Sequence, residues 1–168
     1  MFVKICGITN PDDALAAVEA GARALGFIFV ASSRRFVTPE EIEPWIGRVP
    51  SDVWKVGVFE NEAPESIELI SARLGLDVAQ LHGRETPERH PRGLRVWKAF
   101  RAGDAHADVA DYPAAEAILI DGIAYDWTRA AHFTRPLILA GGLDETNVEA
   151  RIAVSRPWGV DVSSGIES

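Results

Sequence analysis

The chain has 168 residues, of which 47% are hydrophobic and 25% charged, so its size and composition are those of one average globular domain. This composition excludes the disordered, collagen-like and disulfide-rich classes, and we expect a single domain over residues 1–168. With 17 basic and 25 acidic residues, the net charge of −8 argues against a general affinity for nucleic acid or anionic membranes.

The sequence shows no targeting or membrane signal. No apolar run approaches the ~20 residues of a membrane-spanning helix, and the residues after Met1 enter a predicted strand without a signal-peptide pattern. We therefore expect a soluble, cytoplasmic protein. The single cysteine, Cys6, excludes an internal disulfide and a multi-cysteine zinc site, and the scattered histidines argue against a metal site.

Eight short β-branched or apolar runs recur along the chain at intervals that fit one strand, one helix and two loops. Their nearly continuous apolar character is typical of parallel strands covered by helices. The predicted strands are Val3–Cys6, Ala24–Val30, Val53–Phe59, Val78–Leu81, Arg95–Phe100, Ala117–Ile120, Pro136–Ala140 and Gly159–Val162.

Helix signals lie between several of these strands. Asn10 and Thr38 are predicted N-caps, each followed by proline and acidic residues, and the second forms a capping-box sequence. A third helix is predicted to stop at Gly75. Asp144 or Thr146 is the expected cap of a late helix. The segments after the fourth, fifth and sixth strands are short and weakly periodic.

Alternation of strands and helices leaves a closed eight-stranded (β/α)8 barrel or an open doubly wound sheet, and the count of eight favours the barrel. The chain is short for this fold, which typically has ~250 residues and rarely fewer than ~200. Only residues 163–168 follow the eighth predicted strand, so an eighth helix is absent from this sequence. Either the barrel lacks its last helix, or the protein has residues that this sequence omits.

Working residues in parallel α/β folds lie at the carboxyl ends of strands, where this chain has Cys6 and Asp121. Cys6 is either a small buried hydrophobe or a reactive thiol. Asp121 either caps a turn or serves as a general acid, for which a partly dehydrated position would raise its pKa.

Glycine-bearing turns follow the seventh and eighth predicted strands. They contain Gly141 and Gly142 after one strand and Ser163, Ser164 and Gly165 after the other. One Gly-Gly pair is usually only a turn, but two such turns side by side in a barrel favour a phosphate site built from backbone N–H groups and hydroxyls.

Four further polar positions are candidates for ligand contacts. Arg35, beside Arg34, has the guanidinium fork that pairs with a carboxylate, although a solvated loop pair is the alternative. Gln80, His82 and Asp161 lie at or near strand ends.

Read together, these strand ends resemble the phosphoribosylanthranilate isomerase family over essentially the whole chain. The opening Lys4-Ile5-Cys6-Gly7-Ile8-Thr9 and the closing Asp161-Val162-Ser163-Ser164-Gly165-Ile166-Glu167 carry the resemblance most specifically. Between them, in family order, lie Gly26-Phe27-Ile28-Phe29, Ser33-Arg34-Arg35-Phe36-Val37, Val56-Gly57-Val58-Phe59, Gln80-Leu81-His82-Gly83 and Leu139-Ala140-Gly141-Gly142-Leu143.

The resemblance implies a (β/α)8 barrel that isomerises N-(5-phosphoribosyl)anthranilate by an Amadori rearrangement in tryptophan biosynthesis, without a cofactor. It implies Cys6 as general base, Asp121 as general acid and Arg35 as the partner of the anthranilate carboxylate.

The remaining candidates also receive roles from the resemblance. Gln80, His82 and Asp161 would line the pocket, and the two glycine-bearing turns would hold the phosphate of a small-molecule substrate. The alternatives are another phosphosugar-processing barrel enzyme and, if segments are truly deleted, a non-catalytic phosphate-binding barrel. We expect a monomer or a homodimer.

The sequence departs from the family after Asp121, where a glycine-rich insert before an Asp-Trp pair is missing, and after Ser168, where an eighth helix would follow. We expect the expressed protein to carry residues at both places. Intact-mass spectrometry should then give more than 18.3 kDa. A mass of 18.3 kDa would instead show true deletions.

Overall fold

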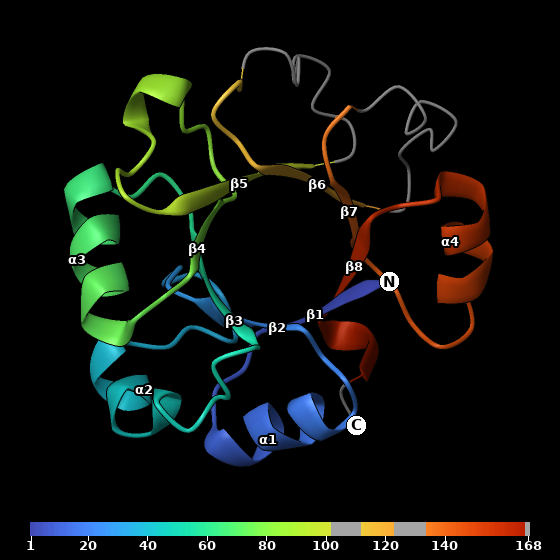
Figure 1. Cartoon of the computed structure of the whole chain (residues 1–168), viewed down its shortest axis with the longest axis horizontal. Coiled ribbons are helices and arrows are strands. Elements are labelled where there is room, and N and C mark those ends of the chain that lie inside the picture. Colours follow the sequence, from blue (N-terminus) through green and yellow to red (C-terminus); the bar gives the residue numbers. More distant parts are fainter. Residues whose placement is uncertain (102–111, 123–133, 167–168) are drawn as a thin grey trace.

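A computed structural model describes residues 1–101, 112–122 and 134–166. Eight parallel strands close into a barrel in sequential order, and Figure 1 shows them as a ring with the helices outside. The strands are β1 (Phe2–Cys6), β2 (Ala24–Ile28), β3 (Trp54–Phe59), β4 (Val78–Leu81), β5 (Arg95–Arg101), β6 (Ala117–Asp121), β7 (Leu137–Ala140) and β8 (Gly159–Val162). The predicted barrel is confirmed.

In the described part of the chain, four α-helices and two 3-10 helices cover the strands. They are α1 (Pro11–Glu19), α2 (Pro39–Ile46), α3 (Pro64–Leu74), η1 (Pro87–Arg89), α4 (Val148–Ser155) and η4 (Ser164–Ile166). The short segment between β4 and β5 contains only η1, in agreement with its weak periodicity. The predicted gap after Asp121 concerns residues 123–133, which lie outside the described residues.

The first three helix boundaries follow the predicted chemistry. The Asn10 side chain accepts a hydrogen bond from the Asp13 N–H at 2.9 Å, and Thr38 and Glu41 form the reciprocal capping box. Helix α3 ends at Gly75, whose φ of 62° is the left-handed conformation that glycine adopts without strain.

The cap predicted for the late helix is wrong, because Asn147 precedes α4. The Asp144 carboxylate instead accepts hydrogen bonds from the N–H of Thr146 at 2.8 Å and from its hydroxyl at 2.6 Å. Both predicted capping side chains are thus engaged in a local turn before the helix begins.

The core has an inner layer within the barrel and an outer layer between barrel and helices. Because side chains alternate along a strand, one set of residues fills the interior while the other packs against the helices. The inner cluster consists of Ala24, Val56, Val78, Trp97, Ala99, Ala117, Leu119, Ile138 and Ala140. The larger outer cluster includes Leu25, Phe27, Ile42, Ile67 and Leu81.

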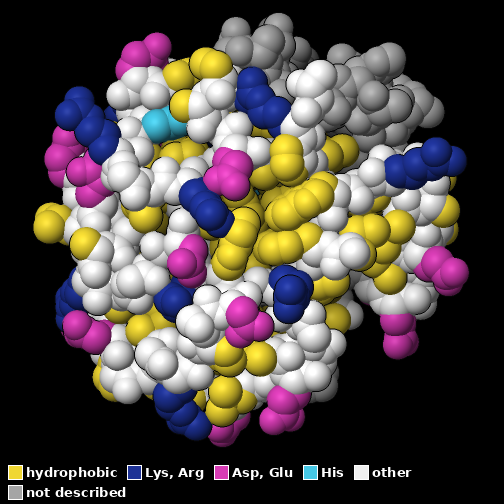
Figure 2. Space-filling view, viewed as in Figure 1, with side chains coloured by type: hydrophobic (Ala, Val, Ile, Leu, Met, Phe, Trp, Pro, Cys, Tyr) yellow, Lys and Arg dark blue, Asp and Glu magenta, His cyan; other side chains and the backbone are white. Residues whose placement is uncertain are grey.

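Aromatic side chains gather around the amino end of β1. Phe2 stacks on Trp158 at a centroid distance of 4.3 Å and also contacts Trp54 and Trp97, and we call these four residues the amino-end aromatic cluster. In the direction of view of Figure 1, Figure 2 shows hydrophobic side chains over the barrel centre with charged side chains around them. This end of the barrel is therefore closed by packing.

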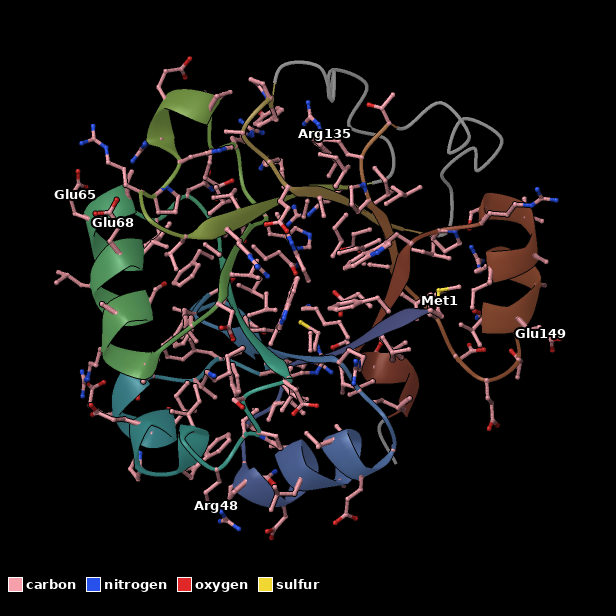
Figure 3. The ribbon with its side chains drawn as sticks, viewed as in Figure 1. Met1, Arg48, Glu65, Glu68, Arg135 and Glu149 are labelled. Carbon is pink, nitrogen blue, oxygen red and sulfur yellow. The ribbon has the colours of Figure 1, made fainter. Side chains whose placement is uncertain are left out.

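Charged side chains lie on the exterior, and the labelled Arg48, Glu65 and Glu149 are on the outer side of the molecule in Figure 3. Among the described residues, none of the helices has the length and apolar character needed to cross a membrane.

Helix α3 allows a matched test of core packing, because Ile67 is 0% exposed and Leu69 is 72% exposed. Ile67→Ala should lower the free energy of unfolding by about 2–5 kcal/mol, through lost burial and a residual cavity. Leu69→Ala should change it by no more than about 0.5 kcal/mol. Urea unfolding of both variants checks this, and equal losses would contradict the described helix orientation.

Candidate functional site

A cavity of about 290 Å³ lies at the carboxyl ends of the strands, where inward-facing polar residues replace the apolar inner layer. In Figure 3, side chains from opposite strands point toward the barrel axis. The cavity is lined by Cys6, Ile28, Arg35, Val58, Gln80, His82, Asp121, Ala140, Gly141, Gly142, Leu143, Asp161, Ser163 and Ser164. All predicted site residues except Gly165 therefore meet in one place.

Cys6 ends β1 and is partly accessible from the cavity. Burial raises the pKa of its thiol, and the positive charge of Lys4 partly opposes this shift. The pKa therefore stays above its usual value, so the thiolate, once formed, is a comparatively strong base.

Lys4 and Asp161 form a buried ion pair beneath the cavity. Lys4 Nζ lies 2.8 Å from Asp161 Oδ2, and the side chains are 0% and 8% exposed. Burial raises the pKa of Asp161, although the Lys4 charge opposes it. Asp161 Oδ1 has no hydrogen-bond partner in the described part of the chain, so it can accept one from a bound molecule.

Asp121 ends β6 and faces His82, which follows β4. His82 Nε2 lies 3.2 Å from Asp121 Oδ2. Hydrogen bonding from His82 lowers the pKa of Asp121 and outweighs the opposing effect of burial. The expected rise in this pKa is therefore wrong, because the imidazole favours the carboxylate form.

The glycine turn after β7 has a backbone that only glycine adopts easily. Gly141 and Gly142 have φ values of 84° and 61°. A Cβ added to Gly141 would lie 2.3 Å from the Gly122 nitrogen and 2.5 Å from Asp121 Oδ1. This turn therefore packs directly against the end of β6.

The turn after β8 contacts the end of β1 and lies close to the turn after β7. The Ser163 hydroxyl donates to the Cys6 carbonyl at 2.9 Å, and Ser164 begins η4. Gly165 does not line the cavity. A Cβ there would lie 1.9 Å from the Leu143 carbonyl oxygen, so Gly165 allows the β8 turn to approach the β7 turn.

Arg35 and Gln80 supply the remaining predicted contacts. The Arg35 side chain crosses Gly7, where an added Cβ would lie 2.2 Å from its Cδ, while neighbouring Arg34 is exposed. Gln80 is buried on β4, and its Oε1 lacks a hydrogen-bond partner in the structure as described. Both side chains can therefore orient a polar ligand.

Sequence reasoning missed the apolar lining residues Ile28, Val58, Ala140 and Leu143, which alternation along the strands could have indicated. It also missed the importance of Lys4. A lysine in the middle of an apolar strand is a detectable signal, because a buried ammonium requires a partner.

No group of three or more histidine, cysteine or acidic side chains in the described ranges is arranged to hold a metal ion. The polar groups of the cavity instead offer a thiol, a carboxylate hydrogen-bonded to imidazole, a guanidinium and glycine turns. This set suits proton transfer on an anionic ligand.

Comparison with known proteins gives consistent matches over the whole chain. The family model described as N-(5′-phosphoribosyl)anthranilate (PRA) isomerase matches residues 3–168. The N-(5′-phosphoribosyl)anthranilate isomerase of Desulforudis audaxviator is 46% identical over 185 residues, covering 99% of this chain and 89% of that protein. This alignment is longer than the 168-residue chain, so the relative has internal residues without a counterpart here.

Two solved structures share the fold closely. The dimeric Thermotoga maritima phosphoribosylanthranilate isomerase, in the form of generated monomers, has a TM-score of 0.91 and 40% identity, covering 100% of this chain and 89% of its own. A phosphoribosylanthranilate isomerase in complex with reduced 1-(o-carboxyphenylamino)-1-deoxyribulose 5-phosphate gives the same four values. This chain belongs to the N-(5′-phosphoribosyl)anthranilate isomerase family.

Proposed function

We propose that this chain converts N-(5-phosphoribosyl)anthranilate to 1-(2-carboxyphenylamino)-1-deoxyribulose 5-phosphate, with Cys6 as general base and Asp121 as general acid. Family membership supports the reaction. The single observation that supports the residue roles is the meeting of Cys6, Asp121 and Arg35 in one cavity with the two glycine-bearing turns.

The proposed reaction begins at the ring oxygen of the sugar. Asp121 donates a proton to this oxygen as the bond to C1′ breaks, which leaves a protonated Schiff base between C1′ and the anthranilate nitrogen. The hydrogen bond between His82 and Asp121 supports a role for His82 in returning the proton to the carboxylate. A lowered pKa makes the protonated Asp121 a stronger acid.

The second step takes place at C2′. The Cys6 thiolate removes the C2′ proton, the electron pair neutralises the Schiff base, and the enolamine formed tautomerises to the ketone. C2′ is oxidised as C1′ is reduced within the same molecule, so the reaction balances without an external redox cofactor. We propose no metal ion in this reaction.

The other lining residues are assigned to substrate binding. Arg35 pairs with the anthranilate carboxylate, and Gln80 and Asp161 accept hydrogen bonds from sugar hydroxyls through oxygens that otherwise have no described partner. We assign the phosphate to the turns of Gly141 and Gly142 and of Ser163, Ser164 and Gly165. Backbone N–H groups there bind an anion without adding positive charge.

A cytoplasmic location and a monomeric or homodimeric state complete the proposal. The Thermotoga maritima relative is described as dimeric, which supports consideration of the homodimer. A phosphorylated small molecule is the proposed ligand, with no role for nucleic acid or membrane.

The catalytic roles are tested with fluorescent phosphoribosylanthranilate generated in situ. Cys6→Ser and Asp121→Asn should each reduce turnover by roughly 10²–10⁴-fold, because each removes a proton-transfer group. Arg34→Gln changes an exposed residue outside the cavity lining and should retain the turnover of the unmodified protein. Unchanged turnover in both Cys6→Ser and Asp121→Asn would refute the assignment.

Gly141→Ala tests whether the β7 turn positions Asp121. The new methyl group would clash with Gly122 N and with Asp121 Oδ1 and displace the carboxylate, so kcat/KM should fall by roughly tenfold or more. Gly21→Ala is the matched control, because Gly21 also has a positive φ, of 96°, but an added Cβ meets nothing within 4 Å. Steady-state kinetics of the two variants should diverge, and equal kcat/KM values would exclude this positioning role.

A further inference from the structure

Lys4 is a fully buried lysine inside the barrel wall, directly below the cavity. Its register partners are Ala24 on β2 and Asp161 on β8, and its ammonium is held 2.8 Å from the Asp161 carboxylate. Burial of an ammonium is costly, and a hydrophobic side chain of similar volume would commonly serve stability as well. Packing alone therefore does not account for a lysine at this position.

The Lys4 ammonium and the Cys6 thiol lie close together beside Gly26. A Cβ built on Gly26 would lie 2.7 Å from Cys6 Sγ and 3.0 Å from Lys4 Nζ. Because both atoms lie within 3.0 Å of the same point, the thiol sulfur and the ammonium nitrogen are less than about 6 Å apart. This places the ammonium inside the range of roughly 4–6 Å at which an opposite charge favours ionisation.

The charged groups around Cys6 come from three parts of the chain. Lys4 on β1 and Arg35 in the loop after β2 lower the pKa of the thiol, whereas Asp161 on β8 raises it and burial raises it most. Among the charged groups, Lys4 has the largest effect. Asp161 and Cys6 in turn keep the pKa of Lys4 above its ordinary value, although burial acts against them.

We propose that Lys4 is a positioning residue whose ammonium, held rigidly by Asp161, stabilises the thiolate of Cys6 for proton abstraction. The inference rests on the proposed role of Cys6 as general base. Lys4 is 0% exposed and so acts through Cys6 without touching the substrate. Because Asp161 fixes the ammonium before the reaction, no reorganisation is needed when the thiolate forms.

The test is the pH dependence of alkylation by iodoacetamide, which reacts with thiolates. Cys6 is the single cysteine of the chain, so the rate reports on it alone. Lys4→Met should move the midpoint of alkylation upward by roughly 1–3 pH units. At a fixed pH below both midpoints, the alkylation rate should therefore fall at least about tenfold.

Lys98→Met is the matched control for loss of a buried ion pair. Lys98 is 1% exposed and lies 2.8 Å from the Glu85 carboxylate, yet it belongs to the outer side of β5 and contacts the loop after β4. This variant should leave the alkylation midpoint unchanged. Lys4→Met leaves the Asp161 carboxylate buried and unpaired. The titration is therefore repeated with the double variant Lys4→Met/Asp161→Asn, in which this carboxylate is absent. The alkylation midpoint of the double variant should also shift upward.

Steady-state kinetics connect the titration to the reaction. The kcat/KM of the unmodified protein should rise with pH as the thiol, whose pKa is raised, loses its proton, and Lys4→Met should move this rising limb upward with the alkylation midpoint. An unmoved midpoint in both Lys4 variants overturns the inference, as does a moved midpoint with an unmoved kinetic limb. Full turnover by Cys6→Ser would overturn the base assignment itself, which is a different and recognisable result.

Discussion

The buried ion pair between Lys4 and Asp161 joins the first strand to the last beneath the candidate site, and closure of the barrel around that site depends on this junction. Its two residues are 157 positions apart in sequence and face each other through the β1–β8 register. Closure of the barrel therefore brings opposite charges together in the interior, where each would be costly alone. The pair lies beneath Cys6 in the barrel interior. The Ser163 hydroxyl, in the turn after β8, donates a hydrogen bond to the Cys6 carbonyl.

Two environments at the same barrel end move the proton affinities of Cys6 and Asp121 in opposite directions. Dehydration strengthens the thiolate as a base, and hydrogen bonding from His82 strengthens the protonated carboxyl as an acid. The raised pKa lowers the fraction of Cys6 present as thiolate, and the lowered pKa lowers the fraction of Asp121 that is protonated. For the proposed base, Cys6, and the proposed acid, Asp121, the balance between reactivity and population is therefore set by neighbouring side chains, Lys4 for the first and His82 for the second.

Sequence reasoning predicted what local patterns determine and missed what barrel closure determines. Apolar runs gave eight strands with small errors at their ends, and the caps at Asn10 and Thr38 followed from side-chain chemistry. The contact of His82 with Asp121 depends on the registers of the intervening strands, so burial alone gave the wrong direction for the Asp121 pKa. Asn147 precedes α4 because a turn already uses Asp144, a competition between neighbours that composition does not show.

The amino-end aromatic cluster separates two optical signals. Trp54, Trp97 and Trp158 pack around Phe2 at the start of β1, whereas the candidate site begins at its other end. These three are among the five tryptophans of the chain, so a large part of the indole emission reports on packing at the amino end of the barrel. In the proposed binding mode, an anthranilate ligand would carry its own chromophore at the opposite end of the barrel, so barrel integrity and site occupancy could be followed at different wavelengths in one sample.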